Sequence, residues 1–336
     1  MTVHSESDDR ELLDGTDLSI GIVSYNAVDA LLSCLRSIID ETSEIQFEIF
    51  VVDNASSDQC ADRADEIDAR VVVIRNDRNL GFAKAVNQAL VRARGKYFLM
   101  LNPDTTVSDR ALEKSLAFLN TQSANTAISC RIVNAAGETH YVRRGRAISS
   151  IRGEFVRHMR LERIFRNTRF FRATVNDFDT DAVSEIPFTQ GSFVMLPTQF
   201  MRELGGLDEQ FELYAEDYDL CCRIYQSGGR ILHYPDATVT HIGAQSSVGI
   251  GLIAHEQMIV NRYRFFRKHC GQWRALCFSA IWCMGAIVDM VRHGRDRLLN
   301  RHGLDPLTMA RSKFTALWFC GLRKARPLPQ PSGQDA

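Results

Sequence analysis

Several common sequence signals are missing from this chain of 336 residues. Its nine cysteines include no C-x-x-C pair, which predicts reduced core thiols in a cytosolic protein rather than a disulfide framework or a zinc site. No G-x-G-x-x-G motif follows the first predicted strand, which argues against a dinucleotide-dependent dehydrogenase. The same turn, SYNAVDA, is neither glycine-rich nor basic, as a nucleotidyltransferase would require. The polar residues 1–16 and the Pro- and Gln-rich residues 325–336 are expected to be disordered.

An excess of charge of either sign is also missing, because the formal net charge is −1. This balance argues against a general nucleic-acid-binding protein. One segment departs from it, and we interpret residues 141–185 as an arginine-rich insertion that could contact a membrane or grip an acceptor diphosphate. A solvated face or an RNA-binding face would be the alternatives, but no RNA-recognition module accompanies the segment. Its arginines are Arg143, Arg144, Arg146, Arg152, Arg157, Arg160, Arg163, Arg166, Arg169 and Arg172.

Apolar runs alternate with helical patterns from Leu18 onward, which predicts an α/β fold with a mostly parallel central sheet flanked by helices. The predicted strands cover residues 18–24, 47–52, 70–75 and 97–101. A helix follows the first strand, with Asn26 as its expected N-cap, and another helix follows Gly81.

Polar clusters follow three of these strands and are candidate walls of a ligand site, because ligands of open α/β sheets bind at the carboxyl ends of strands. Asp53 could accept the N3–H of uracil or thymine, although an aspartate in such a turn is also common for structural reasons. Asp104 in the cluster NPDT could hold Mg²⁺ or Mn²⁺ against a diphosphate, although an ordinary N-P-D turn is the better explanation of this motif when it is taken alone.

Three carboxylates open a predicted helix near residue 216. Glu216, Asp217 and Asp219 fall within four positions, which is more than favourable interaction with the helix dipole requires. A carboxylate fixed at a helix start is well placed as a general base. His241 follows a later strand and carries little weight by itself.

The order of these motifs is more specific than any one of them. The series SYN, VVDNASSD, RNLGFAKAVNQA, FLMLNPDT, QGSFVML, GGLDEQFELYAEDYDLCCR and H-x-G-x-x-S resembles the family 2 glycosyltransferases. It is most similar to the rhamnosyltransferase-type branch, which extends lipid-linked cell-surface polysaccharide. The resemblance covers residues 18–246 and implies a Rossmann-like GT-A domain over residues 17–250.

The resemblance also implies a role for each matching residue. Asp217 matches the catalytic base and Glu216 its neighbour, while Asp104 and His241 match the metal ligands. Asn102 stands where many members carry the first aspartate of the metal motif, which leaves one negative charge fewer. The positions that match the nucleotide-sugar site are Ser24, Tyr25, Asp53, Asn79, Gly81, Phe82, Asn87, Asn102, Gly191 and Ser192.

The resemblance implies an inverting transfer of a sugar from a nucleotide diphosphate donor to a lipid-linked or glycan acceptor, with Mg²⁺ or Mn²⁺ as cofactor. We expect dTDP-rhamnose as the first choice of donor and a UDP-sugar as the second. A nucleotide-sugar-binding module without turnover is the alternative from another class, although Asp104, Asp217 and His241 are all present. No nucleic acid is expected as a partner, and the oligomeric state is left open.

The C-terminal residues 251–324 are expected to form a helical extension. Residues 275–288 are 14 apolar or neutral residues, fewer than the ~20 that a spanning helix needs. Basic residues flank this segment on both sides, which suits an anionic surface. We therefore expect a peripheral protein on the cytoplasmic face of the inner membrane, and a helix packed on the catalytic domain is the alternative.

Overall fold

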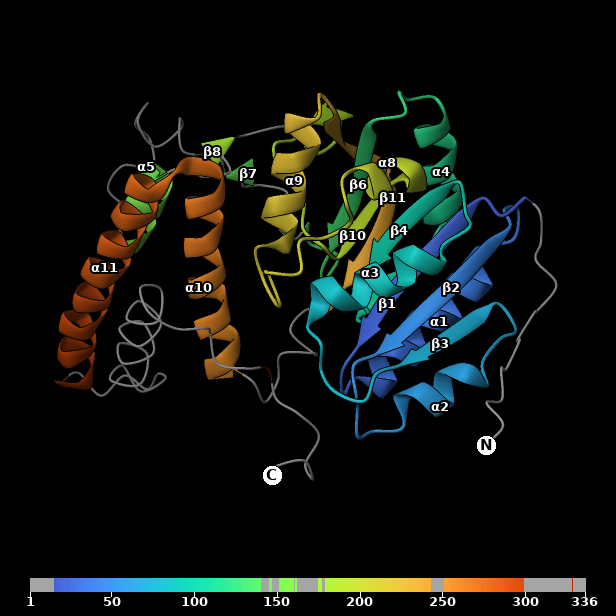
Figure 1. Cartoon of the computed structure of the whole chain (residues 1–336), viewed down its shortest axis with the longest axis horizontal. Coiled ribbons are helices and arrows are strands. Elements are labelled where there is room, and N and C mark those ends of the chain that lie inside the picture. The colour runs from blue at the N-terminus through green and yellow to red at the C-terminus, as the bar shows by residue number, and fades with distance from the viewer. Residues whose placement is uncertain are drawn as a thin grey trace, which may run out of the picture.

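A mixed β-sheet forms the centre of the N-terminal part of the chain (Figure 1). The computed structural model describes residues 15–139, 145–146, 151–159, 161, 175–176, 179–242, 251–298 and 328. Within these ranges the sheet has nine strands in the order β3-β2-β1-β4-β10-β6-β11-β5, with β9 paired to β11. The strands are β1 (Leu18–Ser24), β2 (Phe47–Asp53), β3 (Val71–Arg75), β4 (Tyr97–Leu101), β5 (Thr105–Val107), β6 (Thr126–Val133), β9 (Ser184–Glu185), β10 (Phe193–Pro197) and β11 (Arg230–His241).

Strand direction differs between the two halves of the sheet. β1 runs parallel to β2 and β4, and β2 runs parallel to β3. β10 is antiparallel to β4 and β6, while β11 is parallel to β6 and antiparallel to β5 and β9. The α/β class is confirmed: the sheet is parallel from β3 to β4 and again between β6 and β11, and β10, β5 and β9 add antiparallel pairs. The apolar run of β10 is buried on both faces, and such a run has the same pattern in either direction.

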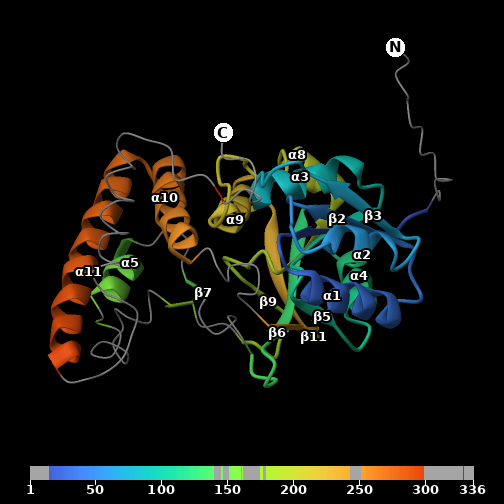
Figure 2. The ribbon, with the colours of Figure 1, turned by 90° about the horizontal axis from the view of Figure 1, so that it is seen from below.

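Helices cover both faces of the sheet (Figure 2). The helices α1 (Val28–Glu41), α2 (Cys60–Asp65) and α4 (Ala111–Asn120) pack on one face, and α3 (Phe82–Arg92), α8 (Thr198–Glu203) and α9 (Glu216–Gln226) pack on the other. Leu31, Leu35 and Ile38 are fully buried because their spacing places them on one side of α1. The sheet is therefore held between two apolar cores.

The start of α1 differs from the expectation. The helix begins at Val28 with Ala27 as its N-cap, so Asn26 is not the cap. The Val28 N–H donates instead to Oδ2 of Asp58, at 2.8 Å, in the loop after β2. Asn26 has a positive φ of 49°, and its Oδ1 accepts the N–H of Ser57 at 2.8 Å. The cap therefore comes from a distant segment, which ties the loops after β1 and β2 together.

A helical extension follows the sheet, as predicted, and consists of α10 (Gly251–Cys270) and α11 (Gln272–Leu298). Figures 1 and 2 place α10 between α9 and α11, and α11 at the side away from the sheet. Aromatic side chains from α9, α10 and α11 share a third apolar core. No helix within the described ranges is long and apolar enough to cross a bilayer.

The predicted insertion 141–185 contains β7 (Gly145–Arg146), α5 (Ile151–His158) and β8 (Val175–Asn176), and most of its arginines lie outside the described residues. Its α5 packs against α11. The predicted disordered ends, residues 1–16 and 325–336, also lie outside the described ranges apart from residues 15, 16 and 328. The domain boundaries at residues 17, 250 and 324 stay predictions.

Candidate active site

The polar clusters after β1, β2 and β4 meet at one edge of the sheet. Ser24 and Asp53 are register partners at the ends of two parallel strands. Asn102 directly follows β4, and its N–H donates to the carbonyl of Ser192 at 3.2 Å, just before β10. These strands are neighbours in the order β2-β1-β4-β10, so the carboxyl ends of the parallel strands present their side chains together.

Asp53 is buried, and one of its oxygens is already engaged. Its Oδ1 accepts the Ser56 N–H at 3.1 Å and the Cys60 thiol at 3.3 Å. No hydrogen bond from the described residues is found at Oδ2, so this oxygen can accept a hydrogen bond from a ligand. The Ser24 hydroxyl beside it is likewise buried without a hydrogen-bond partner in the described part of the chain. Tyr25, next along the chain, is half-buried.

A cavity of about 350 Å³ opens at this point of the edge. Asp53 and Asn76 line it, together with Ala55, Ser56, Gln59, Cys60, Ala61, Asp62 and Arg75. The cavity is therefore a recess that Asp53 lines together with several other polar side chains.

Asn54 joins the loop after β2 to the loop before α3, and no specific sequence signal distinguishes it. Its Nδ2 donates to the Gly81 carbonyl at 3.1 Å, and its Oδ1 accepts Nδ2 of Asn76 at 3.0 Å. Asn54 is buried. An asparagine within DNASSD is indistinguishable from an ordinary turn residue until its distant partners are known.

The predicted loop Asn79–Gly81 contacts the segment that leads into α9. Gly81 has a φ of 85°, and a Cβ there would lie 2.6 Å from the Glu212 carbonyl oxygen. The Phe82 N–H donates to that same oxygen at 2.6 Å, and the Gly81 N–H donates to Asn79 Oδ1 at 3.0 Å. Only glycine fits this close approach of two backbones. Phe82 also lies near Gly191, where an added Cβ would meet its ring at 3.8 Å.

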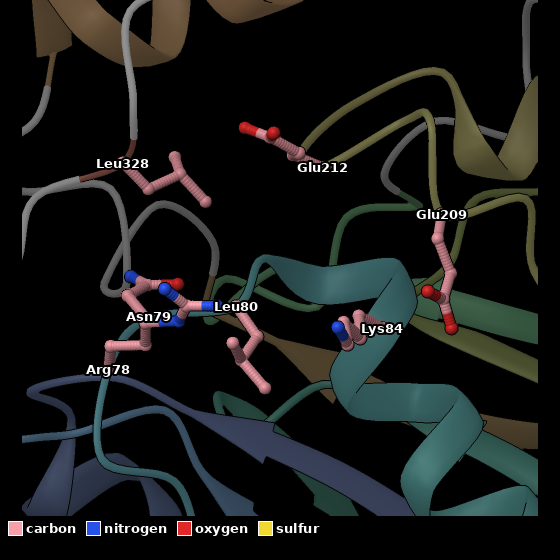
Figure 3. A pocket seen from close by; sticks show the side chains of 7 residues that line it. All are labelled: Arg78, Asn79, Leu80, Lys84, Glu209, Glu212 and Leu328. Atoms are coloured by element: carbon pink, nitrogen blue, oxygen red, sulfur yellow. The ribbon is translucent and has the colours of Figure 1, made fainter.

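A second cavity, of about 340 Å³, lies beside this loop (Figure 3). Its charged lining comes from Arg78 and Lys84 on one side and from Glu209 and Glu212 in the segment before α9. Asn79, Leu80 and Leu328 complete the lining.

Asn87 lies on α3 with both atoms of its amide engaged. Nδ2 donates to the Leu207 carbonyl at 2.8 Å, and Oδ1 accepts the Leu207 N–H at 2.8 Å. The amide thus holds the turn at Gly206, where an added Cβ would lie 2.4 Å from Oδ1. A direct role for Asn87 toward a nucleotide sugar stays a prediction.

Asp104 and His241 lie together at the end of β4 and the end of β11. His241 pairs with Thr105 in the register of β11 and β5, and its Nε2 lies 3.0 Å from Asp104 Oδ1. Nδ2 of Asn102 is 3.3 Å from the same nitrogen. Both Asp104 and His241 are buried, and His241 Nδ1 has no hydrogen-bond partner among the described residues.

This pair fits a divalent cation. Two neighbouring ligands of an octahedral ion at about 2.1 Å are separated by about 3 Å, which is close to the observed distance. A carboxylate oxygen and an imidazole nitrogen are both ligands of Mn²⁺ and related ions. Within the described ranges no three acidic, histidine or cysteine side chains are arranged so that they could hold a metal ion together, so the remaining ligands would come from substrate phosphate and water.

Glu216 and Asp217 begin α9 after a strained turn. Tyr214 and Ala215 have φ values of 68° and 73°, which non-glycine residues adopt at a cost of about 1–3 kcal/mol each. Glu216 is buried, and its Oε2 has no hydrogen-bond partner in the described part of the structure. Asp217 is half-buried, and its Oδ1 accepts the Tyr218 N–H at 2.8 Å. Such strain is characteristic of functional positions.

Burial raises the pKa of both carboxyl groups, and neighbouring groups then change the two pKa values in opposite directions. The pKa of Asp217 is raised to about 6 by burial, and the Tyr218 N–H and the charge of Arg262 counteract part of this effect. The pKa of Glu216 is raised well above its usual value by burial and by the charge of Asp217. Asp217 therefore ionises first, and Glu216 keeps its proton to higher pH. Environments that separate two neighbouring carboxyl groups in this way are typical of acid–base chemistry.

Arg262 approaches this pair from α10 and was missed by the sequence analysis. Its guanidinium lies 4.3 Å from the centre of the Tyr218 ring and forms a buried ion pair with Glu154 of α5. Trp282 Nε1 donates to the same carboxylate at 3.4 Å. Only the folded structure shows that an arginine in a basic helix is buried beside residue 217.

The loop of Gly191 and Ser192, predicted to lie beside the acceptor and the donor sugar, contacts both Asp217 and the end of β4. The Gly191 backbone N–H lowers the pKa of Asp217, and Ser192 is buried with a hydroxyl that has no hydrogen-bond partner among the described residues. The candidate catalytic, donor-loop and metal residues are thus linked by the hydrogen bonds around β4, α3 and α9. The remainder of the H-x-G-x-x-S motif, after residue 242, lies outside the described residues.

Comparison with known proteins identifies the family of the N-terminal part of the chain. Residues 19–183 match the model of glycosyl transferase family 2, so the chain carries a domain of this family. A putative teichuronic acid biosynthesis glycosyltransferase of Bacillus subtilis is 35% identical over 32% of this chain and 43% of its own length. An N-acetylglucosaminyl-diphospho-decaprenol L-rhamnosyltransferase of Mycobacterium tuberculosis is 23% identical over 77% of this chain and 87% of its own length.

A solved structure of GalNAc-T7 with UDP, GalNAc and Mn²⁺ shares the fold, with a TM-score of 0.55, 19% identity, and coverage of 76% of this chain and 48% of that one. The GT-A type of fold is thereby confirmed. The chain spans well under half the length of several curated relatives, at 43%, 35% and 38%.

Proposed function

We propose that this protein is an inverting, metal-dependent glycosyltransferase that moves a sugar from a nucleotide diphosphate donor to an acceptor hydroxyl. The observation that carries the proposal is the position of Glu216 and Asp217 directly after the strained turn that begins α9, where burial raises the pKa of both. Asp104 and His241, 3.0 Å apart, add a candidate metal site. Membership of the domain in glycosyl transferase family 2 supports the reaction class.

The donor site follows from the groups along this edge. Asp53 Oδ2 would accept the N3–H of a uracil or thymine, a donor that adenine lacks. Asp104 and His241 would hold Mg²⁺ or Mn²⁺, which supplies positive charge against the donor diphosphate. The complex of the structural neighbour with UDP and Mn²⁺ supports this combination.

Asp217 acts as the general base in this mechanism. Its carboxylate takes the proton of the acceptor hydroxyl while the hydroxyl oxygen forms a bond to the anomeric carbon. The bond from that carbon to the diphosphate oxygen breaks on the opposite side, so the anomeric configuration inverts. Glu216, which retains its proton, would bind the acceptor or stabilise the start of α9.

The donor sugar and the type of acceptor are proposed from a relative of the chain. The rhamnosyltransferase relative, aligned over 77% of this chain, supports rhamnose as the transferred sugar and a lipid-linked acceptor. We propose dTDP-rhamnose as the first donor and a UDP-sugar as the second. Because a lipid-linked acceptor is held in a membrane, the enzyme would work peripherally at the cytoplasmic face of the inner membrane.

Thermal unfolding with UDP, dTDP, GDP and ADP, each with and without Mn²⁺, tests the donor site. A pyrimidine nucleotide at ~100 times its dissociation constant should stabilise the fold by ~2.7 kcal/mol, and purine nucleotides should not. Equal stabilisation by all four nucleotides would remove the proposed role of Asp53. Sugar transfer from dTDP-rhamnose, with the product configuration assigned by NMR, then tests the reaction, and retention of configuration would contradict the single displacement.

A further inference from the structure

The helix α11 has two apolar faces, and only one of them is covered. Ala275, Phe278, Ile281, Trp282 and Ala286 are buried against the neighbouring helices. On the other face Trp273 is 81% exposed and Ile287 is 53% exposed. We define the α11 stripe as the side chains of Trp273, Leu276, Cys277, Ala280, Met284 and Ile287, all of which are exposed.

The spacing of the α11 stripe places its members on one side of the helix. Each member of the stripe lies three, four or seven residues from other members, and steps of these lengths return to the same side of an α-helix. Four of the nine large exposed apolar side chains of the described residues belong to this one stripe. Figures 1 and 2 show α11 at the outer side of the molecule, with α10 between it and α9. A clustered apolar face of this kind marks an interaction surface.

The basic residues at the ends of the stripe favour an anionic lipid surface over a second copy of the chain as its partner. The stripe contains no charged residue, and Arg274 is exposed at its first turn. The sequence of the helix after the stripe continues with Arg292, Arg295 and Arg297 against Asp289 and Asp296, which leaves one net positive charge. Two copies packed through the stripe, in either direction, would bring basic ends together, whereas anionic lipid headgroups would neutralise both ends.

The distribution of apolar and basic residues along α11 determines how the helix would contact a bilayer. α11 is not apolar enough to span a membrane, but an apolar stripe with basic ends is the pattern of a helix that lies in the interface. We propose that the α11 stripe docks on the surface of an anionic lipid bilayer, with the helix axis in the plane of the membrane. This proposal rests on the proposed lipid-linked acceptor, but binding of the protein to lipid can be measured without donor or acceptor.

Helix α10, which packs against α11, is also bonded to α9, the helix that begins with Glu216 and Asp217. Lys268 Nζ and His269 Nε2, at the end of α10, lie 2.6 Å and 2.7 Å from Oδ1 of Asp219 in α9. Asp219 is fully buried, and Arg223 Nε donates to its other oxygen at 2.7 Å. Docking through α11 would therefore set the orientation of α9, and with it Asp217, relative to the membrane.

Co-sedimentation of the full-length protein with lipid vesicles tests the proposal. The wild-type chain should bind vesicles of phosphatidylcholine with phosphatidylglycerol more tightly than vesicles of phosphatidylcholine alone, and high salt should weaken the binding. Leu276→Glu and Ile287→Glu should each reduce binding at least about tenfold, because each loses the burial of one large apolar side chain. Val91→Glu is the matched control, since Val91 is 78% exposed on α3.

Each outcome decides the proposal. Equal binding of all variants, loss of binding in Val91→Glu, or no wild-type binding to anionic vesicles would overturn it. A lipid-free dimer that Ile287→Glu dissociates would show that a second copy covers the stripe instead. Quenching of Trp273 fluorescence by brominated lipid, absent in Trp273→Phe, would support it. Unchanged turnover of a short soluble acceptor by Leu276→Glu would separate docking from the proposed reaction.

Discussion

Substitution of Asp217 by asparagine should separate catalysis from stability. Asp217→Asn keeps the shape of the side chain and removes the base, so turnover should fall at least ~100-fold. Donor affinity should stay nearly unchanged, because Asp217 is assigned to the acceptor side. Glu216→Gln is the matched control, since glutamine resembles the protonated carboxyl group that the raised pKa of Glu216 favours, and it should cost less turnover.

The same substitution should stabilise the fold at alkaline pH. Burial raises the pKa of Asp217 from 3.8 to about 6, so its contribution to stability is greatest below pH 3.8 and is lost as the pH rises through 6. Each pKa unit corresponds to about 1.4 kcal/mol. The gain in free energy of unfolding for Asp217→Asn should therefore reach up to about 3 kcal/mol at pH 8 and about half of that at pH 5.

Thermal unfolding at both pH values, beside turnover and donor titration, measures these effects. For a domain of this size 1 kcal/mol corresponds to a change in Tm of about 2–4 °C. Glu216→Gln should show a smaller dependence of its Tm difference on pH. Near-normal turnover in Asp217→Asn, a collapse of turnover confined to Glu216→Gln, or lower stability of Asp217→Asn at pH 8 would each refute the assignment.

Three further predictions concern the donor, the metal and the tuning of the base. Asp53→Ala should weaken binding of UDP and dTDP, and it should also lower the Tm of the ligand-free protein because the Ser56 N–H loses its acceptor; unaltered nucleotide titrations would contradict the donor role. Asp104→Ala and His241→Ala should each abolish metal-dependent nucleotide binding by calorimetry, whereas full wild-type activity in excess EDTA would show that the site uses no metal. Arg262→Met, made together with Glu154→Gln so that no buried carboxylate loses its partner, removes a cation that lowers the pKa of the base. The acid limb of the kcat/KM profile should then move to higher pH, and an unmoved limb would mean that the arginine is only structural.

Local patterns were sufficient to predict most of the elements but not their partners. The helix after Gly81 was predictable because apolar spacing and glycine act within a few residues. The direction of β10 and the engagement of Asn54 were not, because both depend on segments far away in the sequence. Arg262 shows the same limit, since a basic helix predicts solvent contact and only tertiary packing buries this side chain beside Tyr218.

The contact between Gly81 and Glu212 constrains how this enzyme could be redesigned. The loop before α3 and the segment before α9 touch backbone to backbone, and no side chain can be added at Gly81 without moving the Glu212 carbonyl. A donor loop transplanted alone from a relative would therefore meet an acceptor segment shaped for a different neighbour. Under the proposed assignment, donor specificity would depend on two segments separated by 130 positions in the sequence, and a successful graft would have to exchange both.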